Sequence, residues 1–243
     1  DPARHPPYLT MALGAGSVTP LQLAAAYGVF ANGGFSVKPY LIDKVYDKDG
    51  RLLMQSNPQK AVGNAPRVID PRNAWLMTNM MQDVVRYGTG ARAAQLGRSD
   101  IAGKTGTTND ARDIWFAGYT PDLVAIAWMG YDQPRSLGRH ETGAQSALPI
   151  WMGFMGPTLK NMPQKGWAMP SGIISVNIDP NTGTRLPDTL IGEFLGKILG
   201  TESTGMVEHF YQEFPPPDAP AAGWNTGADA PADSPTAPPG TPP

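Results

Sequence analysis

Residues 102–131 read AGKTGTTNDARDIWFAGYTPDLVAIAWMGY, and this stretch decides the fold class. Residues 114–119 and 123–131 are apolar runs of strand length, and the turn sequence Thr120-Pro121-Asp122 separates them. The segment 102–108, rich in Gly and Thr, comes shortly before the first run. The stretch therefore predicts three neighbouring antiparallel strands.

Helical patterns lie on both sides of these strands. A helix is predicted over residues 20–31, because Thr19 is a suitable N-cap and Pro20 suits the first helical position. A second helix follows the cap Asp70 and ends near Gly88. A third is predicted from near Pro149 to Gly156.

Two further segments are predicted to be extended. The apolar runs 40–42 and 52–54 flank the turn signal at 47–50, which indicates a pair of strands. Residues 174–178 alternate between apolar and polar side chains and predict one more strand. Helices thus separate runs of antiparallel strands, so the predicted class is α+β, an antiparallel sheet flanked by helices.

The composition indicates where the chain is disordered and excludes several classes of function. Ten of the 26 prolines follow Phe214, so residues 215–243 are predicted to be a Pro/Ala-rich disordered tail. The net charge of -2 offers no basic surface for nucleic acid. The chain has no cysteine and its histidines are isolated, so no metal site is expected. The longest apolar run, 123–129, is too short for a membrane segment.

The candidate site is Lys104-Thr105-Gly106-Thr107. On a strand these residues make an edge with hydroxyls, an ammonium and a glycine that leaves room for close approach. Such an edge can bind the carboxylate and backbone of an extended peptide, and a backbone N–H can face a developing oxyanion. A Gly/Thr-rich turn with a solvated lysine fits the same residues, so the motif alone does not decide.

The order of short sequence blocks over about residues 9–151 resembles the class A penicillin-binding proteins of the 1A type. Their third motif is KTG, which matches Lys104-Thr105-Gly106 within AGKTGTTND. The other blocks are, in order, TMALG (10–14), TPLQ (19–22), AYGVFANGG (26–34), GTGARA (88–93), DIWFAGYTP (113–121), WMGYD (128–132), ETG (141–143) and ALPIW (147–151).

The resemblance implies a β-lactamase or penicillin-binding transpeptidase-like fold and a serine-type D,D-transpeptidase. Such enzymes cross-link peptidoglycan stem peptides that end in D-Ala-D-Ala, and β-lactams acylate the same serine. It implies that Lys104 acts in catalysis, and that Thr105, Gly106 and Thr107 bind substrate, the two hydroxyls holding its terminal carboxylate. The N–H of Thr107 would be an oxyanion donor. No cofactor is implied.

The family's other two motifs are not found in the expected form. No serine has a lysine three residues later, so SxxK is absent from the chain. SxN occurs once, as Ser175-Val176-Asn177, but it follows KTG instead of preceding it, and we interpret it as coincidence. We therefore expect the nucleophile and the second motif to lie upstream of Asp1, the fold to be incomplete, and this chain alone to be inactive.

Two alternatives stay open. One is a non-catalytic binding or scaffold module outside the cytoplasm. The other is a D,D-carboxypeptidase or β-lactamase relative, which passes the acyl group to water.

The predicted organisation has three parts. Residues 1–170 form the C-terminal portion of a transpeptidase domain, 171–214 an extension with a strand, and 215–243 the tail. The class A resemblance also implies a glycosyltransferase domain and a membrane anchor in the missing upstream half, with this chain on the periplasmic side of the bacterial inner membrane.

Overall fold

The structure is a computed structural model that describes residues 7–14, 16–186 and 205–218. The chain divides into two compact units, Asp1–Ile173 and Ile174–Pro243. The predicted tail falls mostly on residues 219–243, which lie outside the described residues. Within residues 215–218, the carbonyl oxygen of Pro217 accepts a hydrogen bond from the Arg185 N–H at 2.7 Å.

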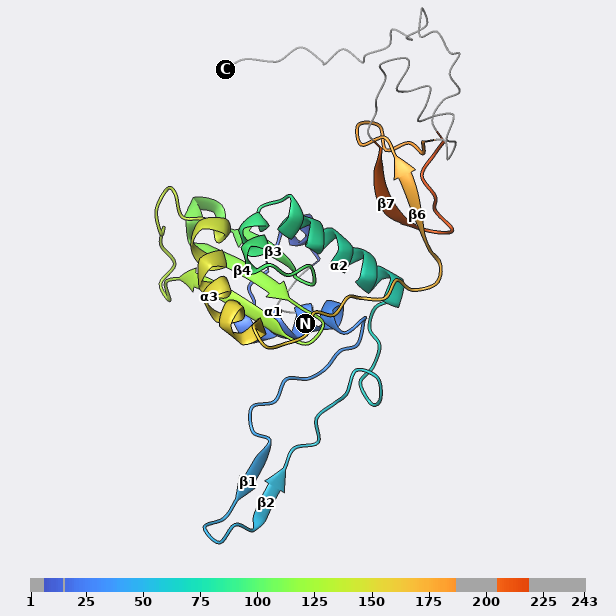
Figure 1. The fold of residues 1–243 in the computed structure, drawn as a ribbon. Coiled ribbons are helices and arrows are strands. Elements are labelled where there is room, and N and C mark those ends of the chain that lie inside the picture. The colour runs from blue at the N-terminus through green and yellow to red at the C-terminus, as the bar shows by residue number, and fades with distance from the viewer. Residues whose placement is uncertain (1–6, 15, 187–204, 219–243) are drawn as a thin grey trace, which may run out of the picture. The chain divides into compact units, whose positions relative to one another are not determined.

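The three predicted strands form the central sheet of the first unit. β3 (Ala102–Thr107), β4 (Asp113–Tyr119) and β5 (Val124–Gly130) are antiparallel in the order β3-β4-β5. The turn between β4 and β5 closes with a hydrogen bond from the Thr120 N–H to the Leu123 carbonyl at 2.8 Å. The predicted α+β class, with an antiparallel sheet and helices against it, is confirmed (Figure 1).

One sheet face packs on α3 (Leu148–Leu159). Phe116 of β4 and Trp151 of α3 are buried and meet edge to face, with ring centroids 5.0 Å apart. The Trp151 indole N–H donates to the Ala125 carbonyl at 3.0 Å, which satisfies its polar atom inside the core. A Cβ at Gly118 would lie 2.7 Å from both rings, so only glycine lets them close over the sheet.

The opposite face packs on α1 (Pro20–Ala31) and α2 (Pro71–Arg86). Tyr119 is fully buried there, against Tyr27 of α1 and Trp167. Its hydroxyl bonds to the hydroxyl of Thr78 on α2 at 2.9 Å. Burial raises the pKa of Tyr119 far above its usual value, so the phenol stays neutral and remains available for this hydrogen bond.

The two helix starts predicted from capping residues are confirmed in detail. Thr19 accepts a hydrogen bond from the Gln22 N–H, and the Gln22 side chain accepts one from the Thr19 N–H. This reciprocal pair satisfies two backbone donors that the first turn of a helix leaves free. At α2, Asp70 accepts from the Arg72 N–H at 2.8 Å. That bond is the main reason why the pKa of Asp70 is lowered.

Two local predictions were wrong. Residues 40–42 are not a strand, and the hairpin instead pairs β1 (Lys44–Tyr46) with β2 (Leu52–Gln55). α3 continues three residues beyond Gly156, through Pro157. It is preceded by a π-helical turn, η4 (Gly143–Ala147), which extends the helical path at its start.

Short 3-10 segments complete the first unit. They are η1 (Leu9–Leu13), η2 (Ala91–Leu96) and η3 (Asn109–Ala111). In the second unit, the predicted strand is present as β6 (Ile173–Ile178), and it pairs with β7 (Met206–Tyr211), which the sequence patterns did not indicate. Among the described residues, no helix is long and apolar enough to cross a bilayer.

Candidate active site

The candidate site residues Lys104, Thr105, Gly106 and Thr107 all lie on β3. β3 pairs only with β4 within the described sheet, so its other edge is unpaired there. The register places Gly106 opposite Trp115 and Thr105 opposite Phe116. Because successive side chains alternate between faces, Thr105 and Thr107 share the α3 face, whereas Lys104 and Gly106 share the other.

The register also fixes where the backbone donors of β3 point. The Thr108 N–H donates to the Asp113 carbonyl at 3.0 Å, just past the end of the strand. In an antiparallel ladder the N–H groups alternate in direction along the strand. The N–H groups of Thr105 and Thr107 are therefore turned away from β4, toward the unpaired edge.

The hydroxyls of the motif are oriented by residues remote in sequence. The Oγ1 atoms of Thr105 and Thr89 lie 2.6 Å apart, which ties β3 to the loop after α2. Thr107 Oγ1 accepts a hydrogen bond from the Gly143 N–H at 3.1 Å. Lys104 Nζ also lies 3.4 Å from Thr105 Oγ1. Because a hydroxyl can make up to three hydrogen bonds, each threonine keeps at least one position for a ligand.

Lys104 is exposed and carries an uncompensated charge. Its Nζ donates to the Thr105 carbonyl at 2.8 Å. Across the described ranges, no carboxylate lies within ion-pair distance of it. An ammonium beside outward N–H groups and two hydroxyls makes this edge a donor-rich strip suited to a carboxylate or an oxyanion.

Gly143 is a site residue that the analysis of single motifs missed. A Cβ there would lie 2.5 Å from the Trp115 carbonyl oxygen and 2.9 Å from that of Gly106. Only glycine allows the turn at 142–143 to lie this close to the motif strand and to donate to Thr107. The signal was present in the ETG block at 141–143, but nothing in the block itself indicates its distance from β3.

The two aromatic residues that follow the motif have different environments. Phe116 is buried in the core, where it packs with α3. Trp115 faces the other side of the sheet, 5.8 Å from the ring of Trp128. The Trp128 indole N–H donates to Asp113 at 2.9 Å, which holds this pair at the start of β4.

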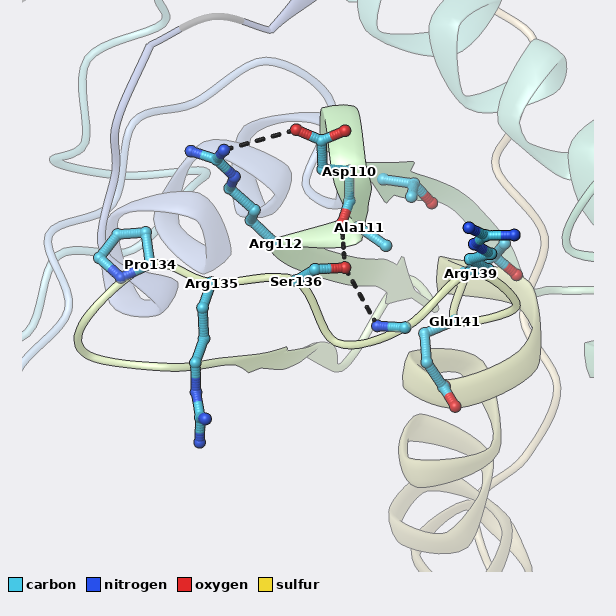
Figure 2. A pocket seen from close by; sticks show the side chains of 11 residues that line it. Asp110, Ala111, Arg112, Pro134, Arg135, Ser136, Arg139 and Glu141 are labelled. Atoms are coloured by element: carbon cyan, nitrogen blue, oxygen red, sulfur yellow. Dashed lines mark hydrogen bonds and ion pairs between the residues drawn. The ribbon is translucent and has the colours of Figure 1, made fainter.

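A pocket of about 810 Å³ adjoins the C-terminal end of β3. Its walls are Thr107, residues 110–112 and side chains from the segment 134–142 (Figure 2). Asp110 and Ala111 have φ angles of 59° and 47°, the left-handed region that non-glycine residues seldom adopt. No sequence pattern indicated this pocket, because its walls come from two separate loops.

The part of the chain that the structure describes contains no cluster of three His, Asp or Glu side chains arranged to bind an ion.

Comparison with known proteins identifies the family. The model of the penicillin binding protein transpeptidase domain matches residues 7–148, more than half of the chain. The chain belongs to the penicillin-binding protein transpeptidase family. The family predicted from the ordered blocks is thereby confirmed.

Individual relatives agree. Penicillin-binding protein 1A of Neisseria lactamica is 53% identical over 176 residues, which are 72% of this chain and 22% of that protein. Penicillin-binding protein 1A of Pseudomonas aeruginosa is 42% identical over 223 residues, 73% of this chain and 27% of the relative. The chain thus spans about a quarter of the length of these transpeptidase relatives.

The transpeptidase fold is also found by structure. The crystal structure of penicillin-binding protein 1A from Haemophilus influenzae has a TM-score of 0.76 with this chain at 33% identity. The match covers 89% of this chain and 35% of that one. The penicillin-binding transpeptidase-like fold expected from the resemblance is confirmed.

Proposed function

We propose that this chain is the KTG-bearing part of a serine-type D,D-transpeptidase that cross-links peptidoglycan stem peptides. Membership of the transpeptidase family supports the reaction class. The observation that carries the proposal is the edge of β3, where Thr105 and Thr107 direct their N–H groups outward beside Lys104, which has no carboxylate partner among the described residues. In the intact protein, β-lactams acylate the serine that attacks the stem peptide.

We give the motif residues the roles that the family resemblance implies. A serine from outside this chain attacks the carbonyl of the penultimate D-Ala, and the Thr107 N–H donates to the oxyanion that forms. The peptide bond then breaks, D-Ala leaves with a proton, and an ester to serine remains. The hydroxyls of Thr105 and Thr107 hold the terminal carboxylate, Gly106 admits the substrate backbone, and Lys104 supplies positive charge and assists proton movement.

The amine of a second stem peptide completes the reaction. Its nitrogen attacks the ester carbonyl, the new amide bond forms, and the serine oxygen leaves with the amine's proton. Because the nucleophile is external to this chain, the isolated chain is inactive and needs the upstream half of the same protein. We place that protein on the periplasmic side of the inner membrane, with an upstream glycosyltransferase domain and anchor, from its likeness to the 1A type.

A fluorescent penicillin tests the proposal. The longer protein that carries this sequence becomes covalently labelled, whereas the isolated chain does not, because it contains no serine followed by lysine at the SxxK spacing. Lys104→Ala in the longer protein slows labelling by at least about 100-fold, the usual contribution of a positioned proton-transfer group. Lys48→Ala, at an exposed turn position, is the matched control and leaves the rate unchanged.

Two results would contradict the proposal. The first is robust labelling of the isolated chain at one of its own serines. The second is labelling of the Lys104→Ala variant within about threefold of the unmodified protein while circular dichroism shows an intact fold, since the motif would then have no chemical role.

A further inference from the structure

The pocket at the end of β3, which we call the basic pocket, is built by two loops that hold each other in place. The Leu137 N–H donates to the Ala111 carbonyl at 2.9 Å, and the Ser136 hydroxyl donates to the Asp110 carbonyl at 2.7 Å. The Gly138 N–H in turn donates to the Ser136 hydroxyl at 3.2 Å. Figure 2 shows the two hydrogen bonds of the Ser136 hydroxyl across the pocket. The carbonyls of the strained turn at 110–111 are therefore used to anchor the loop at 136–138.

Three arginines and two acids line the basic pocket, and four of the five are already engaged. Arg112 lies 3.4 Å from the Asp110 carboxylate. Arg135 stacks on the ring of Tyr131, with its guanidinium carbon 3.8 Å from the ring centroid. The Glu141 carboxylate accepts a hydrogen bond from the Ser146 hydroxyl.

Arg139 is the exception. Arg139 is exposed to solvent, and among the residues that the structure describes no carboxylate, carbonyl or ring holds its guanidinium. In Figure 2, Arg139 and Arg135 lie on opposite sides of the residues that line the pocket. A guanidinium presents donors in a planar fork that matches a carboxylate, and a free one on a pocket wall favours an anionic ligand group.

Thr107 belongs both to the motif strand and to the wall of the basic pocket. It is the last residue of β3 and also lines the basic pocket. If its N–H holds the oxyanion, the carbonyl carbon under attack lies at the entrance to the pocket. The D-Ala leaving group and its carboxylate occupy the strand edge during the first step, so the pocket beyond the strand is free to receive the second reactant.

We propose that the basic pocket binds the acceptor, the molecule whose amine takes over the acyl group, and that Arg139 binds the acceptor's carboxylate. The inference rests on the proposed transpeptidase function and adds the recognition of its second substrate. The carboxylate held by Arg139 orients the neighbouring amine toward the ester carbonyl. Transfer to this amine is then favoured over transfer to water, since water has no carboxylate to bind.

The test uses the longer protein after acylation by a donor peptide that ends in D-Ala-D-Ala. Two acceptors are compared: a D-lysine that carries a fluorophore on its side chain, and the carboxamide of the same compound. Arg139→Gln reduces transfer to the free carboxylate on the order of 10- to 100-fold, the range expected for a lost charged hydrogen bond. Transfer to the carboxamide and the rate of labelling by fluorescent penicillin stay within about twofold.

Controls separate this proposal from the one it rests on. Arg51→Gln, in the β1–β2 hairpin, removes the same charge away from the pocket and changes neither acceptor's rate. Equal loss for both acceptors, or no loss for either, overturns the role of Arg139 while normal penicillin labelling leaves the transpeptidase function standing. Absence of penicillin labelling in the unmodified protein overturns both.

Discussion

The loop that leads into β3 contains a buried ion pair whose loss should weaken the whole first unit. Arg98 Nε and Nη2 donate to the two carboxylate oxygens of Asp100 at 2.8 and 2.7 Å. Arg98 also donates to the carbonyls of Leu159, Met162 and Pro163. The side chains of Arg98 and Asp100 are only 9% and 3% exposed, so bulk water stabilises neither charge. The pair joins the residue two positions before β3 to the end of α3.

Asp100→Ala removes one partner and leaves the Arg98 guanidinium with carbonyl oxygens alone. It also removes the acceptor of the Lys165 N–H, which bonds to Asp100 at 3.0 Å. Breaking a buried pair in this way typically costs about 3–5 kcal/mol. At roughly 2–4 °C per kcal/mol for a chain of this size, the melting temperature should fall by about 6–20 °C.

Thermal unfolding of the chain followed by near-ultraviolet circular dichroism measures this change, because Trp151 and Trp167 report on the core. Asp83→Ala breaks the exposed pair with Arg86 on α2 and is the matched control, expected to cost no more than about 1 kcal/mol. The double variant Arg98→Met/Asp100→Ala should recover part of the loss, since it leaves no buried charge. A melting temperature for Asp100→Ala within about 2 °C of the unmodified chain would refute the reasoning.

Two further predictions concern Gly143 and Asp70. Gly143→Ala puts a Cβ 2.5 Å from the Trp115 carbonyl oxygen, so we expect the free energy of unfolding, measured in urea, to fall by about 1–3 kcal/mol. The control Gly153→Ala has open space at its Cβ and should cause no loss. Equal effects of the two substitutions would contradict the close approach at Gly143. The Asp70 pKa is lowered mainly by the Arg72 N–H, so the folded state favours the carboxylate. The stability advantage over Asp70→Asn should therefore be present above the unfolded pKa of about 3.9 and vanish as the pH falls through the lower folded value. A gap that did not change with pH would argue against this cause.

Features fixed by neighbours in sequence were predictable. Thr19-Pro20 and Asp70-Pro71 mark the first residues of α1 and α2, because capping needs only side chains within one helical turn. The sheet was predictable for the same reason: β3, β4 and β5 are consecutive and joined by short connections, so strand patterns and turn residues suffice.

Features that depend on distant contacts were not predictable. The contact between Thr107 and Gly143 crosses 36 residues, and the Arg98 carbonyl contacts cross more than 60. β7 carries no strand signal strong enough to separate it from its surroundings, and it is defined by pairing with β6. The prediction that α3 ends at Gly156 was wrong. The helix continues to Leu159 because that side chain packs into the core, which outweighs the weak tendency of Gly156 to end a helix.

The candidate site combines both kinds of information. The outward direction of the Thr107 N–H follows from the register between β3 and β4, which the adjacent strands set by themselves. The orientation of the Thr105 and Thr107 hydroxyls instead depends on Thr89 and Gly143, which belong to other elements. The sequence motif therefore identifies the backbone donor, the Thr107 N–H. It does not identify the residues that orient the Thr105 and Thr107 hydroxyls. At this edge, the group closest to the proposed oxyanion is the Thr107 N–H. Its direction depends only on neighbouring strands, so it is also the feature that the local sequence determines most firmly.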